Sequence, residues 1–313
     1  MNQGEKPDLI VAHGPDCLDG MGAVWALHQK WPDIPVVWGV YGQRLETDPT
    51  GLRVLIVDFS YPEEHLREIA AAAHSLTVLD HHASSEKAVK TLLNEALISG
   101  EHRQDRSGAV MAWEYAWGSP VAPKIIAHIQ DRDLWKWEMP WTKEVTALLG
   151  ANQDSDWEAE WSKIGRALES GRTHEVYPLG EAIIRARDVD MAKILRTGCR
   201  EMIIGGHRVP VCNAPFFWSS EIAHAMASER GEGFAATYMD MPDGRKFSLR
   251  SADGEKWPVH EIAKEYGGGG HKAAAGFTVP IGWEGDVDDT EPTEAQLQTI
   301  QMQNRGGVTV VEG

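Results

Sequence analysis

The sequence predicts an α/β protein in which a domain built on a parallel sheet precedes a smaller α/β domain, with a cleft between the two. The first half alternates short apolar runs with helical patterns, as a parallel sheet covered on both faces requires. A long, mostly helical stretch then separates this half from a region of hairpin and strand patterns. With 313 residues, the chain is long enough for two cores. The expected segments are a first domain at 1–173, a helical linker at 174–198, a second domain at 199–281 and an acidic tail at 282–313.

The first domain is predicted from four short apolar runs that are typical of buried strands. They are residues 9–12, 36–40, 54–57 and 77–79. Helical patterns follow or separate them, at residues 20–30, 61–73, 108–117 and 122–129. The second of these helices carries a start signal, because Ser60 and Glu63 fit a capping box and Pro62 is tolerated in a first turn.

The second domain is predicted from turn signals between apolar runs. Gly205 and Gly206 lie between residues 202–204 and 208–212, which indicates a β-hairpin. A helix at 219–228 and two strands around Pro242-Asp243-Gly244, at 234–239 and 246–251, complete the pattern, and the unit ends near Pro280. The remaining tail is acidic and short of large apolar residues, so we expect it to be disordered.

Composition excludes several classes of protein. No stretch approaches the roughly 20 apolar residues that span a bilayer, so no membrane association is expected. Residues 1–7 have no apolar signal core, and the three cysteines are too few and too scattered for a disulfide framework. We therefore expect a cytoplasmic protein. A net charge of −17 disfavours a long nucleic-acid duplex as the ligand, because duplex binders usually carry a basic stripe.

Residues that can bind metal ions follow three of the predicted strands. Because the carboxyl ends of parallel strands meet at one edge of a sheet, such residues converge from distant parts of the chain. A further acidic group, Asp131-Arg132-Asp133, follows a helical run. The residues after the three strands are His13 with Asp16 and Asp19, then Asp58, then Asp80 with His81 and His82.

Carboxylates and imidazoles in this pattern indicate a metal-activated hydrolase. They suit Mn²⁺, Mg²⁺ or Zn²⁺, and crowded carboxylates are costly unless cations neutralise them. Two ions about 3.5–4 Å apart can activate a water molecule and hold a phosphoryl group. Taken singly, Asp19 could cap a helix, His13 could sit in an ordinary turn, and Cys17 fits a small packing residue better than a ligand. Their joint occurrence at three strand ends favours the metal site.

The same residues resemble a known family. Val78-Leu79-Asp80-His81-His82 is similar to the signature of the DHH phosphoesterase superfamily. The first loop at 13–20, the second-motif Asp58 and the string at 131–135 agree with it, in the family's order. Residues 247–251 followed by the glycine-rich string at 267–277 resemble the DHH-associated domain. The resemblance covers about residues 8 to 280.

This resemblance implies a site with two divalent metal ions, Mn²⁺ first, with Mg²⁺ or Co²⁺ as alternatives. Asp58 would bridge the ions, His82 would contact the scissile phosphate or assist proton transfer, and Asp80 would orient a histidine. One departure concerns the first loop, where many members have His, three residues, Asp, one residue, Asp. In this chain Asp16 follows His13 after two residues. The implied ligands are His13, Asp16 and Asp58 for one ion, and Asp19, Asp58, His81 and Asp131 for the other.

The resemblance also places substrate binding in the second domain. Glycines free the backbone to bring amide groups close to an anion, and a short helix beginning near His271 would point its N-terminus at the same anion. A flexible turn is the alternative for the string, and an ordinary surface arginine is the alternative for Arg250. The implied substrate-binding residues are Arg250, Gly268, Gly269, Gly270 and His271.

The predicted function is hydrolysis of phosphodiester bonds in a short RNA or DNA oligonucleotide or a small nucleotide. A single-strand-specific exonuclease and a catalytically inactive nucleotide sensor are the alternatives. The sequence leaves the oligomeric state open, a homodimer included. Among the thirteen tryptophans, Trp135, Trp137 and Trp141 could line the cleft and stack on bases, although core packing is the commoner role of tryptophan.

Overall fold

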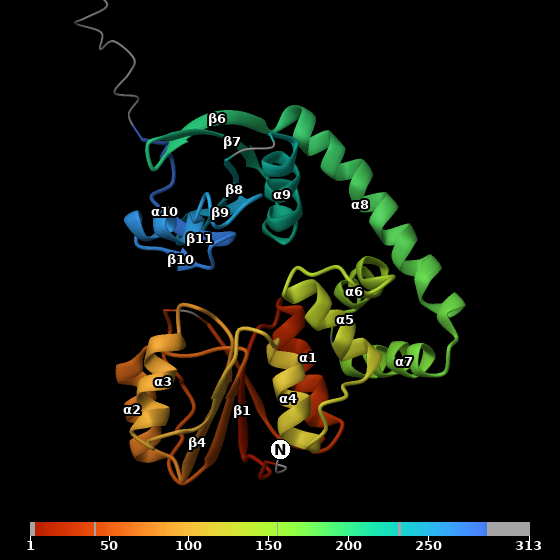
Figure 1. Ribbon diagram of the computed structural model, residues 1–313, viewed down its shortest axis with the longest axis vertical. Coiled ribbons are helices and arrows are strands. Elements are labelled where there is room, and N and C mark those ends of the chain that lie inside the picture. The colour runs from red at the N-terminus through yellow and green to blue at the C-terminus, as the bar shows by residue number, and fades with distance from the viewer. Residues whose placement is uncertain (1–3, 41, 155, 231–232, 287–313) are drawn as a thin grey trace, which may run out of the picture. The chain divides into compact units, whose positions relative to one another are not determined.

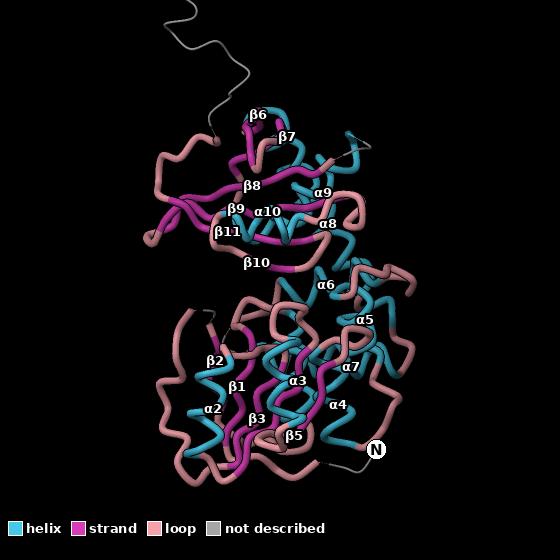
Figure 2. The backbone as a smooth tube through the Cα atoms, turned by 60° about the vertical axis from the view of Figure 1, so that its left-hand side comes forward, coloured by secondary structure: helices cyan, strands magenta, loops and turns pink. Residues whose placement is uncertain are grey.

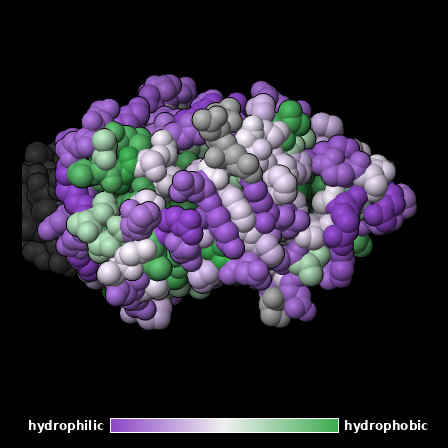
Figure 3. Space-filling view, turned by 90° about the horizontal axis from the view of Figure 1, so that it is seen from below, coloured by the Kyte–Doolittle hydropathy of each residue, from purple (hydrophilic) through white to green (hydrophobic). Residues whose placement is uncertain are grey.

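The computed structural model describes residues 4–286, apart from 41, 155, 231 and 232 (Figure 1). The chain divides into two compact units, Met1–Ala192 and Lys193–Gly313, and each unit contains its own sheet. Within the described part of the chain, no helix combines the length and the apolar character needed to cross a membrane. One face of the surface, shown in Figure 3, is mostly hydrophilic, with hydrophobic side chains in separate small groups.

A five-stranded, all-parallel sheet forms the centre of the first unit. Its strand order is β2-β1-β3-β4-β5. The predicted α/β class with a parallel sheet is therefore confirmed, and the four predicted strands are all present. The fifth strand escaped prediction because it lies at the sheet edge and has a polar sequence, Ser-Gly-Glu-His. The strands are β1 (Leu9–His13), β2 (Val36–Gly39), β3 (Arg53–Val57), β4 (Ser75–Asp80) and β5 (Ser99–His102).

Helices cover both faces of this sheet (Figure 1). Alternate residues of a strand point to opposite faces, so Ile10 and Leu55 pack against one helical layer while Val11 and Ile56 pack against the other. The first layer contains α1 (Leu18–His28) and α4 (Gly108–Trp117), and the second contains α2 (Glu63–Ala72) and α3 (Glu86–Asn94).

The helix start predicted at Ser60 is wrong. Helix α2 begins at Glu63, with Pro62 as its N-cap residue, and the Ser60 hydroxyl donates to the carbonyl oxygen of Tyr61. Ser60 is therefore outside the helix and cannot cap it.

More helices extend the first layer and lead to the second unit. The helices α5 (Lys124–Asp133), α6 (Thr142–Gly150) and α7 (Trp157–Glu169) add to the core on the side of α1. After a 3-10 turn at Thr173–Glu175, helix α8 (Tyr177–Thr197) runs through the boundary between the two units. In α8 only Gly180 is buried.

The second unit is built on a six-stranded sheet of order β10-β11-β9-β8-β7-β6, seen in Figure 2. All neighbouring strands are antiparallel except β7 and β8. Gly205 and Gly206, with φ of 58° and 72°, form the predicted turn between β6 and β7. The elements are β6 (Cys199–Ile204), β7 (His207–Asn213), a 3-10 turn (Phe216–Trp218), α9 (Ser219–Arg230), β8 (Phe234–Met241), β9 (Gly244–Ser251), α10 (Val259–Glu265), β10 (Gly269–Gly270) and β11 (Ala274–Val279).

Two of the three cysteines form a disulfide, which the sequence interpretation did not anticipate. Cys199 and Cys212 are 13 positions apart, but they face each other in the ladder between β6 and β7. The register of the hairpin, fixed by its glycine turn, brings them together. Cys17 is a free thiol in the first unit.

The packed structure of the second unit extends past Pro280 to Asp286. Trp283 packs edge-on against Phe247, with ring centroids 5.2 Å apart. The Asp286 carboxylate accepts hydrogen bonds from the Tyr266 hydroxyl and the Gly205 amide. The first five residues assigned to the acidic tail, 282–286, thus belong to the folded unit. The rest of that predicted tail, 287–313, lies outside the described residues.

Candidate metal centre

Three neighbouring strands of the first unit end in histidine and carboxylate side chains. His13 is the last residue of β1, Asp58 directly follows β3, and Asp80 is the last residue of β4, followed by His81 and His82. Because these strands are parallel and adjacent in the sheet, their carboxyl ends lie side by side.

Asp58 is at the centre of this group and is almost fully buried. Its Oδ1 lies 3.0 Å from Nε2 of His81, and its Oδ2 lies 3.7 Å from Nδ1 of His13. Burial opposes ionisation of this carboxyl, but its interactions with the rings of His13 and His81 hold the pKa of Asp58 well below its usual range. Its φ of 56° is uncommon for a non-glycine residue, and such backbone persists where the surrounding structure imposes it.

A glycine of helix α4 makes room for Asp58. A Cβ atom at Gly108 would lie 2.3 Å from the Cβ of Asp58, so a larger residue there would displace the carboxylate. The amides of Gly108 and Ala109 donate to the two carboxylate oxygens of Asp19, at 2.5 and 3.0 Å. Asp19 therefore accepts from the first two amides of α4, whose N-cap residue is Ser107, rather than capping its own helix α1, and the positive end of α4 faces this carboxylate.

His81 connects Asp58 to two other carboxylates. Its Nε2 lies 3.7 Å from Oδ2 of Asp19 and 3.6 Å from Oδ2 of Asp133. Burial opposes protonation of the ring, but the hydrogen bond to Asp58 and the charges of Asp133 and Asp19 raise the pKa of His81 to about 10. A protonated His81 ring would place one positive charge beside these three carboxylates.

The donor atoms form three overlapping groups, each with its atoms within 4.8 Å of one another. Asp58 belongs to two of these groups and His81 also belongs to two, so the shared residues join the three groups into one cluster. The groups are His13 with Cys17 and Asp58, Asp58 with His81 and His82, and Asp19 with His81 and Asp133.

The chemistry of this donor set fits divalent cations. Oδ2 of Asp133 is buried and, within the described part of the chain, has no hydrogen-bond partner. Burial and the negative charges of Asp58 and Asp133 raise the pKa of Asp19. Burial also raises the pKa of Asp133. Carboxylates held this close without a cation carry an electrostatic cost that a bound ion would remove.

Asp131, predicted as a ligand, is not part of the cluster. Its carboxylate accepts hydrogen bonds from the amides of Glu138 and Met139 and from the hydroxyl of Thr142, at 2.8, 3.1 and 2.6 Å. Asp133 takes the predicted place. Both residues lie at the end of α5, where positions two apart point to nearly opposite sides, so only one of them can face the cluster.

Asp16, also predicted as a ligand, is exposed and absent from the three groups. The neighbouring Cys17 lies at the site instead, with Sγ 3.5 Å from Oδ2 of Asp58. Burial, and then the charge of Asp58, raise the pKa of this thiol. A signal for Cys17 was present in the sequence. The order His13, three residues, Cys17, one residue, Asp19 matches the first-loop spacing of the superfamily that the sequence resembles, with cysteine in place of the first aspartate.

Asp80 orients His82. Its Oδ1 lies 2.8 Å from Nδ1 of His82, and its Oδ2 accepts a short hydrogen bond from the hydroxyl of Ser85. Burial opposes ionisation of Asp80, but the bond to His82 lowers the pKa of this carboxyl, and the same bond raises the pKa of His82 against the effect of burial. His102 Nε2 lies 2.9 Å from the carbonyl oxygen of His82. Ser85 and His102 were not singled out from the sequence.

In the second unit, Arg250 and the glycine string lie close together. Arg250 pairs in register with Ala274 at the start of β11. Its guanidinium donates to Ser220 Oγ at 2.6 Å and to Ser248 Oγ at 3.0 Å. Ser220 belongs to the first turn of α9.

The short helix expected near His271 is absent. Gly269 and Gly270 form strand β10, and the His271 amide donates to the Ala274 carbonyl in a turn. A Cβ atom at Gly268 would lie 2.1 Å from the carbonyl oxygen of Gly276, so the glycine is needed there for close packing of two chain segments.

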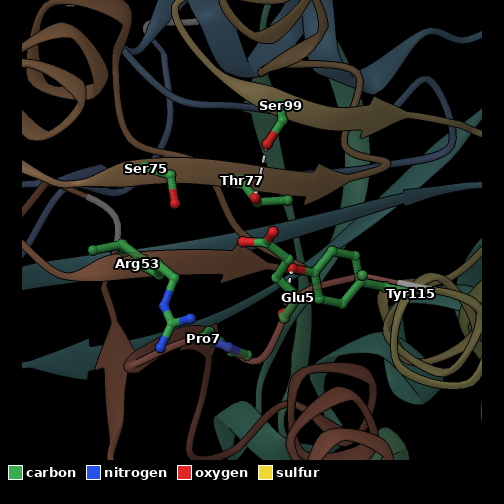
Figure 4. A pocket seen from close by; sticks show the side chains of 9 residues that line it. Glu5, Pro7, Arg53, Ser75, Thr77, Ser99 and Tyr115 are labelled. Carbon is green, nitrogen blue, oxygen red and sulfur yellow. Dashed lines mark hydrogen bonds between the residues drawn. The ribbon is translucent and has the colours of Figure 1, made fainter. Parts of the chain in front are cut away.

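A cavity of about 290 Å³ with a mixed polar and apolar lining lies at the other end of the same sheet as the cluster (Figure 4). It is lined by residues at the amino ends of β3, β4 and β5, together with Glu5 and Tyr115. Arg53 in its wall is held by three hydrogen bonds to the Asp8 carboxylate, two from its guanidinium and one from its main-chain amide. The cavity holds none of the clustered donors.

No family model matches the chain. An uncharacterized protein, R106, of Acanthamoeba polyphaga mimivirus is 28% identical over 230 residues. The match covers 72% of this chain and 52% of the viral protein, so the chain spans about half the length of this curated relative.

Three solved structures are similar over nearly the whole chain. The pGpG-specific phosphodiesterase PggH of Vibrio cholerae is 14% identical with a TM-score of 0.43, over 96% of this chain and 99% of that one. An exopolyphosphatase-related protein of Bacteroides fragilis is 13% identical with a TM-score of 0.42, over 96% and 93%. An uncharacterized protein of Helicobacter pylori G27 is 12% identical with a TM-score of 0.35, over 95% and 97%. All three TM-scores are below 0.5.

Proposed function

We propose that this chain is a metal-dependent phosphoesterase that hydrolyses phosphodiester bonds in short oligonucleotides or small nucleotides. The observation that carries the proposal is the convergence of imidazole, thiol and carboxylate donors on the shared carboxylate of Asp58. The motifs that resemble the DHH phosphoesterase superfamily supply these residues, which supports the same reaction class.

The protein's own residues have separate tasks in this proposal. Divalent ions, when bound, would polarise the phosphoryl group and lower the pKa of a bound water molecule. Asp58 contacts both His13 and His81, so it is the residue suited to hold two ions at a fixed spacing. His82, oriented by Asp80, would contact the scissile phosphate or donate a proton to the leaving oxygen.

The donor set also bears on which metals are used. The resemblance implies Mn²⁺, with Mg²⁺ or Co²⁺ as alternatives. A thiolate from Cys17 is a softer ligand than the aspartate it replaces, and soft ligands favour later transition metals over Mg²⁺. We therefore expect Mn²⁺, Co²⁺ or Zn²⁺ to bind more tightly than Mg²⁺.

The proposed substrate is short and anionic. A net charge of −17 does not favour a long phosphate polymer, whereas bound cations would attract a small one locally. Arg250 and the turn after Gly270, which lie together in the second unit, are the proposed contacts for a terminal phosphate or a base.

The test is a substrate panel on metal-stripped protein with single ions added back. The panel holds dinucleotides, 3′,5′-bisphosphates, cyclic dinucleotides, a short single strand and bis-p-nitrophenyl phosphate, with product analysis. We expect turnover of at least one diester that depends on the added ion and is abolished by Asp58→Asn. Asp16→Asn is the matched control, since Asp16 is exposed and lies outside the three donor groups.

Two results would count against the proposal. Undiminished turnover by Asp58→Asn would show that the cluster is not the catalytic centre. Tight binding of metal and nucleotide with no turnover across the panel would identify an inactive sensor instead.

A further inference from the structure

A cavity of about 580 Å³ lies in the first unit, between the helices α1, α4 and α7 and the start of α5. These helices belong to the layer on one face of the parallel sheet (Figure 1). Ligand pockets commonly enclose roughly 300–1,000 Å³ and have a mostly apolar lining with a few polar groups. The cavity has this size and this character, and it shares no residue with the donor groups of the metal centre.

Three tryptophans in the lining are held in fixed orientations. The indole N–H of Trp25 donates to Ser162 Oγ at 3.1 Å, and that of Trp113 donates to the carbonyl oxygen of Val121 at 3.0 Å. The indole N–H of Trp117 donates to a main-chain carbonyl of α1 at 3.4 Å. The rings of Trp113 and Trp117 stack with centroids 5.0 Å apart and planes at 22°. Because each indole N–H has a partner, the tryptophans offer the cavity a preformed wall of apolar ring surface.

A glycine of α7 leaves space in the cavity. Gly165 lies inside the helix, where glycine is destabilising relative to alanine. A Cβ atom there would lie 3.6 Å from Cγ2 of Ile125 and 3.7 Å from Cζ2 of Trp25, which are ordinary contact distances. Close packing therefore does not require this glycine, unlike Gly108. Because Gly165 lines the cavity, a longer side chain at this position would take up part of the volume.

Two charged side chains line the cavity, and one of them already has a structural role. Glu169 Oε1 accepts a hydrogen bond at 2.6 Å from the amide of Lys124, the first residue of α5, so it satisfies a free amide at that helix start. Within the part of the chain that the structure describes, the exposed guanidinium of Arg166 makes no hydrogen bond or ion pair. The rim of the cavity therefore carries one positive charge that is available to a ligand.

We propose that this cavity binds a small planar aromatic molecule that carries one anionic group. Aromatic rings gain offset and edge-to-face contacts with indoles beyond the area that they bury, so the wall favours them over alkyl chains. The guanidinium of Arg166 suits a carboxylate or a phosphate. Aromatic carboxylates and nucleoside monophosphates share this chemistry. The proposal does not depend on the metal centre, because the ligand is not required to be a substrate.

The test measures the binding of two fluorescent probes to the full chain. Anilinonaphthalene sulfonate is an aromatic anion, and phenylnaphthylamine is the same aromatic skeleton without the sulfonate. Arg166→Gln removes the charge at the rim. Lys163→Gln is the matched control, because it removes one exposed positive charge from the same helix outside the cavity lining.

Arg166→Gln is expected to weaken binding of the sulfonate probe by roughly 3- to 10-fold, between the effect of an exposed ion pair and that of a hydrogen bond to a charged group. Binding of the uncharged probe should not change, and Lys163→Gln should leave both probes unaffected. Equal effects of the two variants on the sulfonate probe would show that only overall charge matters and would overturn the proposal.

A second pair of variants tests the cavity itself. Gly165→Leu should weaken both probes by more than about 10-fold, because its side chain would fill space beside Trp25. Gly165→Ala adds one methyl group at ordinary contact distances, so it should leave the urea midpoint no lower and most of the binding intact. Unchanged binding of both probes by a folded Gly165→Leu protein would show that they bind elsewhere. If Gly165→Leu does not fold, the comparison of Arg166→Gln with Lys163→Gln decides.

Competition against the sulfonate probe tests the class of ligand. The competitors are indole acetate, adenosine monophosphate and octanoate. Displacement by either aromatic anion at lower concentration than octanoate would support the proposal, and the more effective of the two would show whether a carboxylate or a phosphate is preferred. Displacement by neither, or by octanoate equally well, would overturn the proposed class. These results do not involve turnover, so they stand apart from success or failure of the proposed hydrolysis.

Discussion

At the scale of single residues, the site depends on which of two nearby carboxylates faces the cluster. Asp131 and Asp133 are two positions apart at the end of one helix, and their surroundings differ. Asp131 is fully hydrogen-bonded to the following loop, whereas one oxygen of Asp133 is buried without a hydrogen-bond partner among the described residues. We therefore expect different roles for the two residues: Asp131 stabilises the following loop, and Asp133 binds metal.

Asparagine substitutions separate these roles. Asp133→Asn should weaken metal binding by more than about 10-fold while leaving the metal-free protein at least as stable, because it removes a crowded charge. Asp131→Asn should destabilise the protein by about 1–3 kcal/mol, since the loop amides lose a charged acceptor, and it should leave the metal sites intact. Calorimetric metal titration and urea unfolding of both variants measure the two effects. The reverse pattern would restore Asp131 as the ligand.

At the scale of elements, the site requires helix α1 to lie very close to strand β1. A Cβ atom at Gly20 would lie 1.8 Å from the carbonyl oxygen of His13. This approach is what brings Asp19, in the first turn of α1, to the end of β1. The close packing of α1 against β1 thus explains why glycine occupies position 20.

Gly20→Ala should therefore destabilise the protein by about 1–3 kcal/mol, because the added methyl group must push α1 away from β1. It should also weaken metal binding, since Asp19 would move with the helix. Gly150→Ala is the matched control. Gly150 ends α6 with nothing within 4 Å of an added Cβ atom, so this change should be neutral or slightly stabilising. Urea unfolding compares the two, and equal effects would disprove the packing argument.

An ion pair at the amino end of the sheet gives a pH-dependent prediction. Hydrogen bonds from Arg53 lower the pKa of Asp8 from 3.8 to about 2. A depressed carboxyl pKa stabilises the folded state above pH 3.8, and this contribution is lost as the pH falls from 3.8 toward 2. Both side chains are more than one third exposed, so the effect should be small.

We expect Asp8→Asn to be slightly less stable than the unmodified protein at pH 6, with the difference disappearing by about pH 2. Thermal unfolding across that range measures it. A difference that persists unchanged at pH 2 would show that Asp8 acts through packing rather than through charge.

At the scale of the whole molecule, the two units contain different stabilising chemistry. The candidate metal centre is entirely in the first unit, and the Cys199–Cys212 disulfide is entirely in the second. Each unit also has its own hydrophobic core. The stability of each should therefore respond to a different reagent.

Chelation and reduction should act on separate unfolding transitions. Removing metal with a chelator should destabilise the first unit by about 2.7 kcal/mol for each bound ion, relative to protein with ions at 100 times their dissociation constant. Reducing the disulfide should destabilise the second unit by about 2–3 kcal/mol, given the short loop that it closes. Differential scanning calorimetry resolves the two transitions, and a single transition that responds to both reagents would contradict this independence.

The sequence alone determined the parallel sheet and the strand ends at which His13, Asp58 and His81 meet. An apolar run defines a buried strand by itself, and parallel strands necessarily bring their carboxyl ends to one edge. The same local reasoning located the hairpin turn at Gly205 and Gly206, because those glycines supply the positive φ that the turn requires.

Only the tertiary structure decided which of the neighbouring candidates faces the site. The choice of Asp133 over Asp131 depends on the rotation of a helix end, where Asp131 is bonded to the residues that follow it. The choice of Cys17 over Asp16 depends on the path of the first loop. The pairing of Cys199 with Cys212 likewise required the register of two strands. Local sequence patterns specify an element and its end, but side-chain direction at that end is fixed by contacts that the pattern does not contain.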